Sequence, residues 1–356
     1  MTSPRVLITP FFTTNPYQTE FVTALRAEGI DVCTHCGWWF LTSFLRSRSN
    51  ILHVHWLHAF FGLRTPLRAA IGCALFAAQL ALVRLCGGKI VWTVHNMSTH
   101  EASYPWLDHV ANTLIARSSA RILVHCSWAK QRVLQRFPSV AVPRVVVTPH
   151  ASYVGTYPNT VARATARRAF GLGDGDIALL LFGLIRPYKG VLALLDAFDA
   201  VRANEALKLL VVGRPLDETF ARAVRNRAAT IPNVSLVLRF VDDHEIQHYM
   251  NAADAVVLPY RDIFTSGAAL LAMSFGKPIV APPIACMGEL LTSEGAFLYS
   301  PNNTDGLRTA LQRVAWERER LGTMGRRNLD QARALTWRGM AEKTVSVYRD
   351  TLMTSS

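Results

Sequence analysis

Residues 177–190 read Ile-Ala-Leu-Leu-Leu-Phe-Gly-Leu-Ile-Arg-Pro-Tyr-Lys-Gly. The first six form a continuous apolar run, which is typical of a strand buried on both faces of a parallel sheet. A helical pattern over 190–201 and a second apolar run over 208–212 follow. This order predicts a βαβ unit whose first turn lies at the carboxyl end of a strand, where open α/β sheets bind ligands.

The same alternation of short apolar runs and helical stretches continues on both sides of this unit. After it, strands are predicted at 234–238, 255–258 and 278–281, with helices at 217–230, 243–251 and 266–275. Before it, strands are predicted at 6–9, 51–55, 89–95, 121–125 and 145–149, with helices at 18–28, 65–85, 104–117 and 129–136. Such alternation favours doubly wound parallel sheets over other fold classes.

The chain is long enough for two such domains. It has 356 residues, half of them hydrophobic, which is more than one ordinary α/β core needs. Residues 151–161 have no periodicity and read as a linker. We therefore expect two Rossmann-like domains that face a cleft, at 1–155 and 165–335, with a C-terminal helix in 336–356 that crosses back to the first domain.

The net charge of +13 is concentrated in the N-terminal half. Residues 1–165 contain 15 Lys and Arg against five Asp and Glu, whereas residues 166–356 contain 23 against 20. A basic domain indicates an anionic partner. Because no nucleic-acid-binding motif accompanies the charge, we expect an anionic membrane surface or a phosphorylated acceptor, and no nucleic acid.

Localisation rests on three further features. Cys33 and Cys36 form a C-x-x-C, but no second pair completes a zinc site. No secretory signal precedes the first predicted strand, so we expect a cytoplasmic protein at the inner face of the plasma membrane. The apolar run 69–83 is shorter than the roughly 20 residues of a membrane span, which leaves a buried core helix and membrane-surface contact as alternatives.

Two loops have the chemistry of a diphosphate site. In the first, Gly183 permits close approach of a ligand to the backbone, and Arg186 and Lys189 place two cations at a helix N-terminus, which already favours anions. In the second, Leu258-Pro-Tyr-Arg-Asp-Ile-Phe-Thr-Ser-Gly267, the residues Ser266 and Gly267 stand where a helix begins. Ser266 alone would be an N-cap, but beside the first loop we predict that it contacts phosphate.

These motifs resemble those of GT-B-fold glycosyltransferases, in a branch of family 4 that includes the bacterial β-mannosyltransferases of xanthan-type exopolysaccharide assembly. The resemblance covers nearly the whole chain and rests on the following stretches: Phe182-Gly-Leu-Ile-Arg-Pro-Tyr-Lys-Gly190, Leu258-Pro-Tyr260 with Ser266-Gly267 and Gly276-Lys-Pro278, Asn15-Pro-Tyr17, His53-Val-His-Trp56, Trp92-Thr-Val-His-Asn96, His100-Glu101, Pro149-His150 and Tyr157-Pro-Asn159.

Two departures from that family's pattern concern acidic residues. Retaining family members carry two Glu residues eight positions apart, where this chain has Ile263 and Leu271. The branch also shows His-Trp-Pro-Glu where this chain has His55-Trp-Leu-His58. The recognition of donor sugar and ribose by that Glu pair is therefore not carried over.

The resemblance implies transfer of a hexose from a nucleotide sugar. Arg186 and Lys189 would stabilise the leaving diphosphate in place of a metal, since neither of the two loops contains an Asp-x-Asp motif. Glu101 is the predicted base for the acceptor hydroxyl, with His100 and Asp108 as alternatives. Donor binding is assigned to Gly183, Arg186, Lys189, Tyr260, Ser266, Gly267, Glu289, His95, His150, Phe240 and Val241. Acceptor binding is assigned to Asn15, Tyr17, Trp56 and Asp108.

Three functions remain open at this point. The first hypothesis is an inverting, metal-independent transferase that moves mannose from GDP-mannose to a lipid-diphosphate-linked oligosaccharide in exopolysaccharide biosynthesis. The second is a soluble transferase that uses a UDP-sugar and a small acceptor. The third is an inactive, nucleotide-sugar-binding assembly subunit, which the missing Glu pair suggests.

Overall fold

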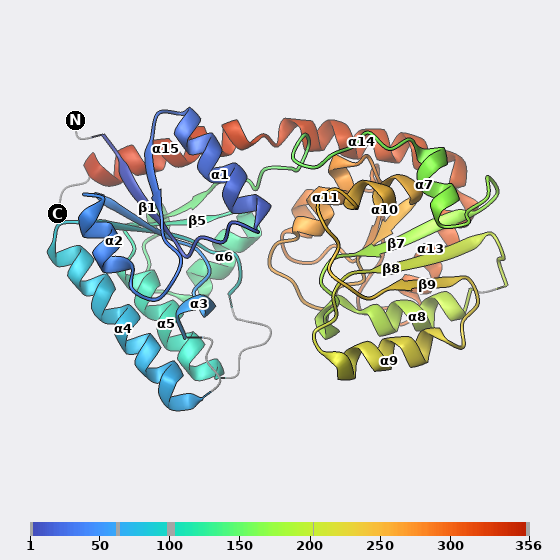
Figure 1. Cartoon of the computed structure of the whole chain (residues 1–356), viewed down its shortest axis with the longest axis horizontal. Coiled ribbons are helices and arrows are strands. Elements are labelled where there is room, and N and C mark those ends of the chain that lie inside the picture. The colour runs from blue at the N-terminus through green and yellow to red at the C-terminus, as the bar shows by residue number, and fades with distance from the viewer. Residues whose placement is uncertain (1–2, 62–64, 98–103, 202, 354–356) are drawn as a thin grey trace. The chain divides into compact units, whose positions relative to one another are not determined.

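The computed structural model describes residues 3–61, 65–97, 104–201 and 203–353. Its contacts divide the chain into two compact units. Unit 1 comprises 1–151 together with 335–356, and unit 2 comprises 152–334. Figure 1 labels the elements of both units.

Unit 1 is built on a six-stranded parallel sheet with the order β2-β1-β3-β4-β5-β6. The strands are β1 (Arg5–Thr9), β2 (Asp31–Thr34), β3 (Ile51–Val54), β4 (Lys89–Thr93), β5 (Arg121–Val124) and β6 (Val145–Val147). The strand order reverses between β1 and β3, so the carboxyl ends of these two strands form the switch point at which α/β sheets place ligands.

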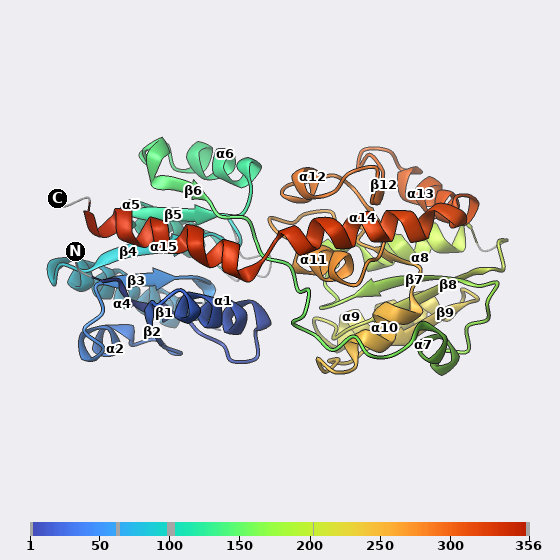
Figure 2. The same ribbon diagram turned by 90° about the horizontal axis from the view of Figure 1, so that it is seen from above.

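Helices cover both faces of this sheet (Figures 1 and 2). One face carries α1 (Pro16–Ala27) and α15 (Trp337–Met353), which lie side by side and share a hydrophobic cluster with the sheet. The other carries α2 (Phe40–Arg46), α3 (His58–Phe61), α4 (Pro66–Leu85) and α5 (Pro105–Ser118). The short helix η1 (Val142–Arg144) and α6 (Ser127–Arg136) flank β6.

Unit 2 is also built on a six-stranded parallel sheet, with the order β12-β11-β10-β7-β8-β9. The strands are β7 (Ile177–Phe182), β8 (Leu207–Val212), β9 (Val234–Val237), β10 (Ala255–Val257), β11 (Ile279–Ala281) and β12 (Ala296–Leu298). The first strand, β7, lies between β8 and β10, so the switch point is at the carboxyl ends of β7 and β10.

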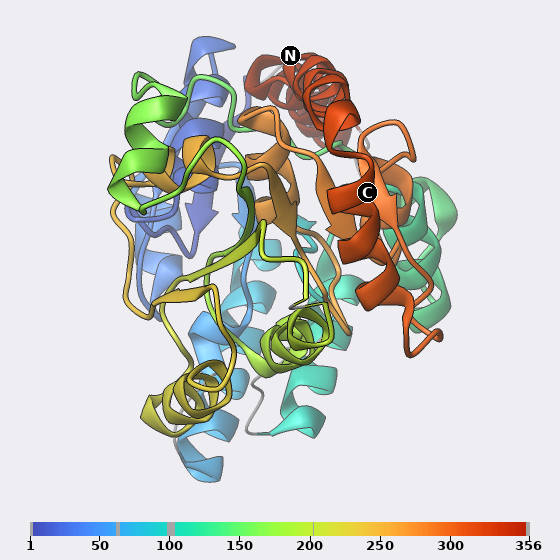
Figure 3. The same ribbon diagram turned by 90° about the vertical axis from the view of Figure 1, so that its right-hand side faces the viewer.

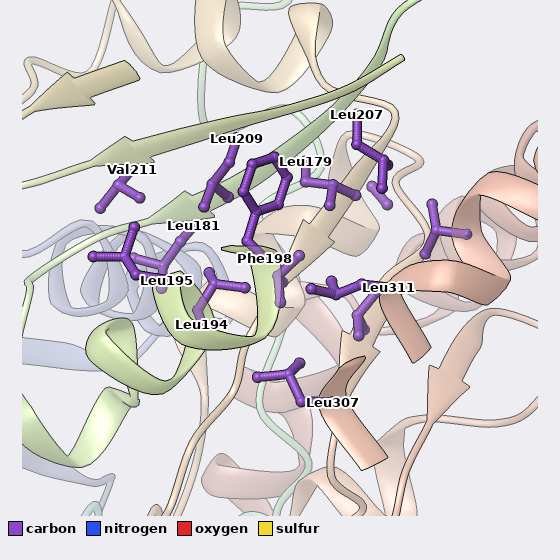
Figure 4. Packing of buried hydrophobic residues seen from close by; sticks show 14 of the residues in the cluster. Leu179, Leu181, Leu194, Leu195, Phe198, Leu207, Leu209, Val211, Leu307 and Leu311 are labelled. Atoms are coloured by element: carbon purple, nitrogen blue, oxygen red, sulfur yellow. The ribbon is translucent and has the colours of Figure 1, made fainter. Parts of the chain in front are cut away.

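The helices of unit 2 enclose this sheet in two hydrophobic clusters. Leucines of β7 and β8 pack on α8 (Val191–Asp199) around Phe198, with α9 (Glu218–Ala228) and α13 (Gly306–Trp316) on the same face (Figures 3 and 4). The opposite face packs on α10 (Ile246–Ala252) and α11 (Gly267–Ser274). The remaining helices are α7 (Arg163–Ala169), η2 (Pro187–Lys189), α12 (Met287–Leu290), η3 (Arg318–Arg320) and α14 (Leu321–Ala334).

The architecture confirms the predicted fold class, two doubly wound parallel sheets. The sequence did not reveal the edge strands β2 and β12. In β2, only Val32 is buried, so the strand lacks the apolar run that marks a central strand. Helices α13 and α14 also carry the chain beyond the last predicted strand, and α15 packs on α1.

Candidate active site

The first predicted loop is fixed by close backbone approaches at the carboxyl end of β7. Gly183 has φ 113°, and Gly213, after β8, has φ 144°. A Cβ on Gly213 would lie 1.7 Å from the carbonyl oxygen of Gly183. Only glycine fits there, so the turns after β7 and β8 lie against each other at the carboxyl edge of the sheet.

A third glycine joins the first loop to the second. Gly190 has φ 72° and separates η2 from α8. A Cβ there would lie 2.1 Å from the carbonyl oxygen of Pro259, just after β10. Arg261 N–H donates to the carbonyl oxygen of Tyr188 at 2.8 Å. The two loops predicted to share one ligand are therefore in direct backbone contact.

Lys189 lies at the centre of this junction. Its Nζ is 3.6 Å from the position that a Cβ on Gly183 would take, and 5.7 Å from the ring centroid of Tyr260. Burial, with the nearby Arg186 charge, lowers the pKa of Lys189 to about 8. The charged form of a half-buried lysine beside a second cation is unfavourable unless an anion offsets the positive charge. The surroundings of Lys189 therefore favour the binding of an anion.

Arg186 forms the other side of the first loop. Its Nη1 donates to the carbonyl oxygens of Ile185 at 3.2 Å and Arg214 at 3.3 Å. These bonds hold the guanidinium close enough to Lys189 for its charge to disfavour the protonated lysine. The structure thus brings the two predicted cations together.

The second loop ends at the N-terminus of α11. Ser266 caps this helix, since its Oγ accepts from the N–H of Ala269 at 3.1 Å. The side chains of Ser266 and Tyr260 are hydrogen-bonded to each other, and burial raises the pKa of the Tyr260 phenol. A continuous set of contacts therefore runs from Lys189 through Tyr260 to the first N–H groups of α11, which are free of intrahelical partners by position.

Tyr153 is a site residue that sequence reasoning missed. Its hydroxyl would be 3.3 Å from a Cβ on Gly267. Its backbone N–H donates to Ser274 Oγ at 2.9 Å. Tyr153 lies in the aperiodic segment that we interpreted as a linker, and no pattern there distinguishes it. Any side chain larger than that of glycine at position 267 would contact this hydroxyl. Gly267 therefore also leaves space for Tyr153.

Three further donor-binding predictions lie around the same edge of the sheet. Phe240 follows β9 and is 55 % exposed, so its ring is accessible to a ligand. Val241, by contrast, is packed in the hydrophobic core of unit 2, so core packing explains this residue as well as contact with a nucleotide base does. Glu289 is exposed in α12, in the loop after β11.

A cavity at the opposite, amino edge of the same sheet does not compete with this site. It has a volume of about 320 Å³ and is lined in part by Arg163 and Lys277. Arg163 and Arg167 there pair with Asp254 at 2.6 Å and 3.0 Å. The carboxylate of Asp254 therefore offsets the charge of these cations.

The switch point of unit 1 carries a cluster of imidazole and aromatic rings. Tyr17 is at its centre, with ring centroids 5.0 Å from His95, 4.8 Å from His150 and 5.8 Å from Trp56. Trp56 stacks on His95 at 4.0 Å. The structure therefore brings four of the predicted ligand residues together in one unit.

The same cluster contains buried histidines with defined partners. His53 Nδ1 is 2.5 Å from Tyr348 Oη, and its Nε2 is 2.7 Å from Thr93 Oγ1. His55 Nδ1 is 2.9 Å from His95 Nε2. These contacts give His53 and His55 a structural role, and they tie α15 to β3 and β4.

Burial keeps these imidazoles neutral. It lowers the pKa of His53 and His150 to about 3 and that of His125 to about 4, and it holds the pKa values of His55 and His95 well below their usual range. Mutual repulsion between the imidazolium forms adds to the effect for His55 and His95. Neutral rings with such low basicity are suited to hydrogen-bonding sugar hydroxyls rather than to removing their protons.

Asp108 lies next to the ring cluster. It is buried in the first turn of α5 and lines a cavity of about 20 Å³, room for one water molecule, with His95, Asn96 and Trp56. The predicted base Glu101 and its neighbour His100 lie outside the described residues. Asp108 is thus a carboxylate that the structure places beside the predicted ligand residues of unit 1.

Asn15 has a structural role in the same region. Its Oδ1 accepts from the N–H of Tyr17 at 3.1 Å, which makes it the N-cap of α1, and Pro16 follows at the first helical position. The Asn-Pro-Tyr motif therefore positions Tyr17 in the ring cluster. Among the described residues, no group of three His, Cys, Asp or Glu side chains has the arrangement of a metal site.

Comparisons with known proteins agree with this geometry. Residues 176–315 match the family model described as Glycosyl transferases group 1. The chain is 29 % identical over 287 residues to a GDP-mannose:glycolipid 4-beta-D-mannosyltransferase of Xanthomonas campestris pv. campestris, covering 79 % of this chain and 74 % of that protein. It is 25 % identical to a lipopolysaccharide 1,2-N-acetylglucosaminetransferase of Salmonella typhimurium over 57 % of this chain and 55 % of that one.

Solved structures share the fold at lower identity. Sucrose-phosphate synthase of Thermosynechococcus elongatus superposes with a TM-score of 0.77 at 16 % identity, over 99 % of this chain and 100 % of that one. Anabaena HepE, in complex with UDP-glucose, gives 0.75 at 13 %, over 99 % and 100 %.

Two parallel six-stranded sheets, each with polar or charged side chains gathered at its switch point, form the GT-B fold that these solved structures share. On this fold, residues 176–315 match the group 1 glycosyltransferases, and the chain is a glycosyltransferase. The predicted recognition is confirmed at this level, and the inactive-subunit hypothesis is set aside.

Proposed function

We propose that this glycosyltransferase moves mannose from GDP-mannose to a lipid-diphosphate-linked saccharide in exopolysaccharide assembly, with inversion and without a metal ion, at the cytoplasmic face of the membrane. The observation that carries the donor half is the junction of two backbone-joined loops that hold Lys189, Arg186 and the N-terminus of α11. The choice of mannose and glycolipid rests on what the Xanthomonas relatives are named for.

The chemistry of the donor half follows from charge. When the bond between the anomeric carbon and the diphosphate oxygen breaks, its electron pair goes to the diphosphate. The positive charges of Arg186 and Lys189 and the helix dipole of α11 stabilise that developing charge. Since the free site holds two like charges close together, binding an anion also relieves their repulsion.

The acceptor half needs a base and sugar-binding groups. The acceptor hydroxyl oxygen forms the new bond to the anomeric carbon, and its proton passes to a carboxylate. We assign that carboxylate to Glu101, with Asp108 as the alternative, because the buried histidines are too weakly basic. Tyr17, Trp56 and His95 provide a ring platform of the kind that binds sugars.

The experiment that tests the donor is a panel of nucleotide sugars and nucleoside diphosphates followed by thermal unfolding. Ligand binding to the folded state raises the midpoint by mass action. We expect GDP-mannose and GDP to raise it and UDP-glucose and UDP to leave it unchanged. Stabilisation by UDP and UDP-glucose alone would replace the proposal with the UDP-sugar alternative.

The second step tests the reaction itself. Radiolabelled GDP-mannose is incubated with a lipid-diphosphate-linked oligosaccharide, and label in the lipid phase is measured. Lys189→Ala should reduce that label at least a hundredfold, whereas Lys277→Ala, a lysine at the opposite edge of the sheet, should not. No transfer to the lipid, with transfer to a small sugar instead, would overturn the glycolipid acceptor.

A further inference from the structure

Helix α4 is apolar on every side, yet only one side is covered. Its inner stripe is buried against the sheet and the neighbouring helices and consists of Ala69, Gly72, Cys73, Phe76, Gln79, Leu80 and Val83. Its outer stripe repeats at helical spacing and is exposed over the full length: Leu67, Ile71, Ala74, Ala78, Leu82 and Leu85. Helices that are apolar all round are normally buried all round.

The exposure of the outer stripe is large. Leu67 is 71 % exposed and Leu85 82 %, and Ile71 and Leu82, between them, are 48 % and 43 % exposed. No charged residue interrupts the helix between Arg68 and Arg84. A water-facing stripe of this length without a polar residue indicates a surface that is covered in the working protein.

Aromatic side chains extend this surface onto the neighbouring element. The segment that begins α2 is tied to the middle of α4, because Gln79 accepts from the N–H of Leu41 at 3.1 Å and donates to the carbonyl oxygen of Trp38 at 2.8 Å. Trp38 and Trp39 are 41 % and 49 % exposed. Exposed tryptophans beside an apolar helix are typical of proteins that lie at the boundary between lipid and water.

The charge of the surrounding sequence selects the kind of partner. Residues 32–100 contain no Asp or Glu but six Lys and Arg. Arg68 and Arg84 stand near the two ends of the outer stripe, where a long side chain can reach lipid head groups while its stem stays apolar. This chemistry fits an anionic bilayer surface, which combines apolar tails with negative head groups.

We infer that the outer stripe of α4, with Trp38 and Trp39, is the surface by which this enzyme lies on an anionic membrane. The helix is long and apolar enough to span a bilayer, longer than the run predicted from the sequence. However, its inner stripe packs on α2, α3, α5 and β4, so spanning would dismantle unit 1. The inference deepens the proposed function, because a membrane is the surface that presents a lipid-linked acceptor.

The test measures sedimentation of the full chain with vesicles of phosphatidylcholine, alone or mixed with phosphatidylglycerol. We expect at least tenfold tighter binding to the mixed vesicles, and weaker binding at high salt because exposed charges are screened. Ile71→Glu/Leu82→Glu should reduce that binding at least tenfold. Leu67→Glu/Leu85→Glu, at the most exposed positions and therefore safest for folding, should have the same effect.

The matched control is Leu216→Glu/Trp316→Glu, which changes two exposed apolar residues of unit 2 and should bind vesicles like the unaltered chain. Thermal stabilisation by GDP-mannose, measured without lipid, separates this inference from the proposed function, since the two can fail independently. Unaltered vesicle binding by both α4 variants would overturn the inference. So would self-association of the chain through the outer stripe of α4 in the absence of lipid. A chain that alkaline carbonate cannot extract from membranes would also overturn it, because such a chain spans the bilayer.

Discussion

Lys189 gives the donor site a pH dependence of its own. Its pKa of about 8 in the free enzyme means that it is mostly protonated at pH 7 and loses its charge as the pH rises. A bound diphosphate favours the charged form, so kcat/KM for the donor should fall about tenfold per pH unit above roughly pH 8. A pH profile of initial rates measures this.

The matched substitutions distinguish Lys189 from other groups. Lys189→Arg should remove the decline, because guanidinium stays protonated. Lys277→Arg should keep it, although burial also lowers the pKa of Lys277 to about 8. A decline that persists in Lys189→Arg and disappears in Lys277→Arg would refute the assignment.

The base is a second prediction at the scale of single residues. Glu101→Gln should reduce kcat by roughly 10²–10⁴ while leaving the affinity for GDP-mannose unchanged, since removal of a general base acts on the acceptor step. Asp108→Asn should reduce kcat less than tenfold. Single-turnover rates with saturating donor provide the measurement. If Asp108→Asn shows the large loss and Glu101→Gln the small one, their roles are exchanged.

At the scale of elements, Gly190 is the residue at which the first loop contacts the second loop. Gly190→Ala would place a Cβ 2.1 Å from Pro259 oxygen at φ 72°, so we expect a loss of at least about 2 kcal/mol of stability and weaker donor binding. Gly171→Ala has the same backbone strain, at φ 65°, with no atom within 4 Å. It should cost only about 1 kcal/mol and leave donor affinity intact. Equal effects in chemical denaturation and donor titration would show that the Gly190–Pro259 contact is unimportant.

The elements also show what sequence patterns can reveal. The strands β7 and β8 and the loop from Gly183 to Gly190 were predictable, because a buried parallel strand is an unbroken apolar run and cations beside glycines mark an anion site. Tyr153 was not predictable, since it reaches Gly267 only through the fold of an aperiodic segment. Nor was the exposure of the outer stripe of α4, because an apolar helix gives the same sequence signal whether one side or both are covered.

At the scale of the whole molecule, basic charge and buried histidines are both concentrated in unit 1. Titration of the buried imidazoles links the stability of this unit to pH. His53 and His125, with pKa values of about 3 and about 4, stay neutral in the folded state, whereas the unfolded chain binds protons below about pH 6.5. Their contribution to stability is therefore intact above pH 6.5 and is lost as the pH falls toward 4.

This linkage leads to a prediction for acid unfolding. Each such histidine should remove up to about 1.4 kcal/mol of stability per pH unit below 6.5, so the thermal midpoint should fall steeply between pH 6.5 and 4.5. His125→Asn preserves a donor for the carbonyl oxygen of Thr148, which His125 Nδ1 contacts at 2.9 Å, and should flatten the fall. His244→Asn, an exposed position in unit 2, should leave it unchanged. If the thermal midpoints of His125→Asn and of the unaltered chain fall in parallel as the pH is lowered, this imidazole is protonated in the folded protein. The ring platform assigned to the acceptor would then lie beside a positive charge.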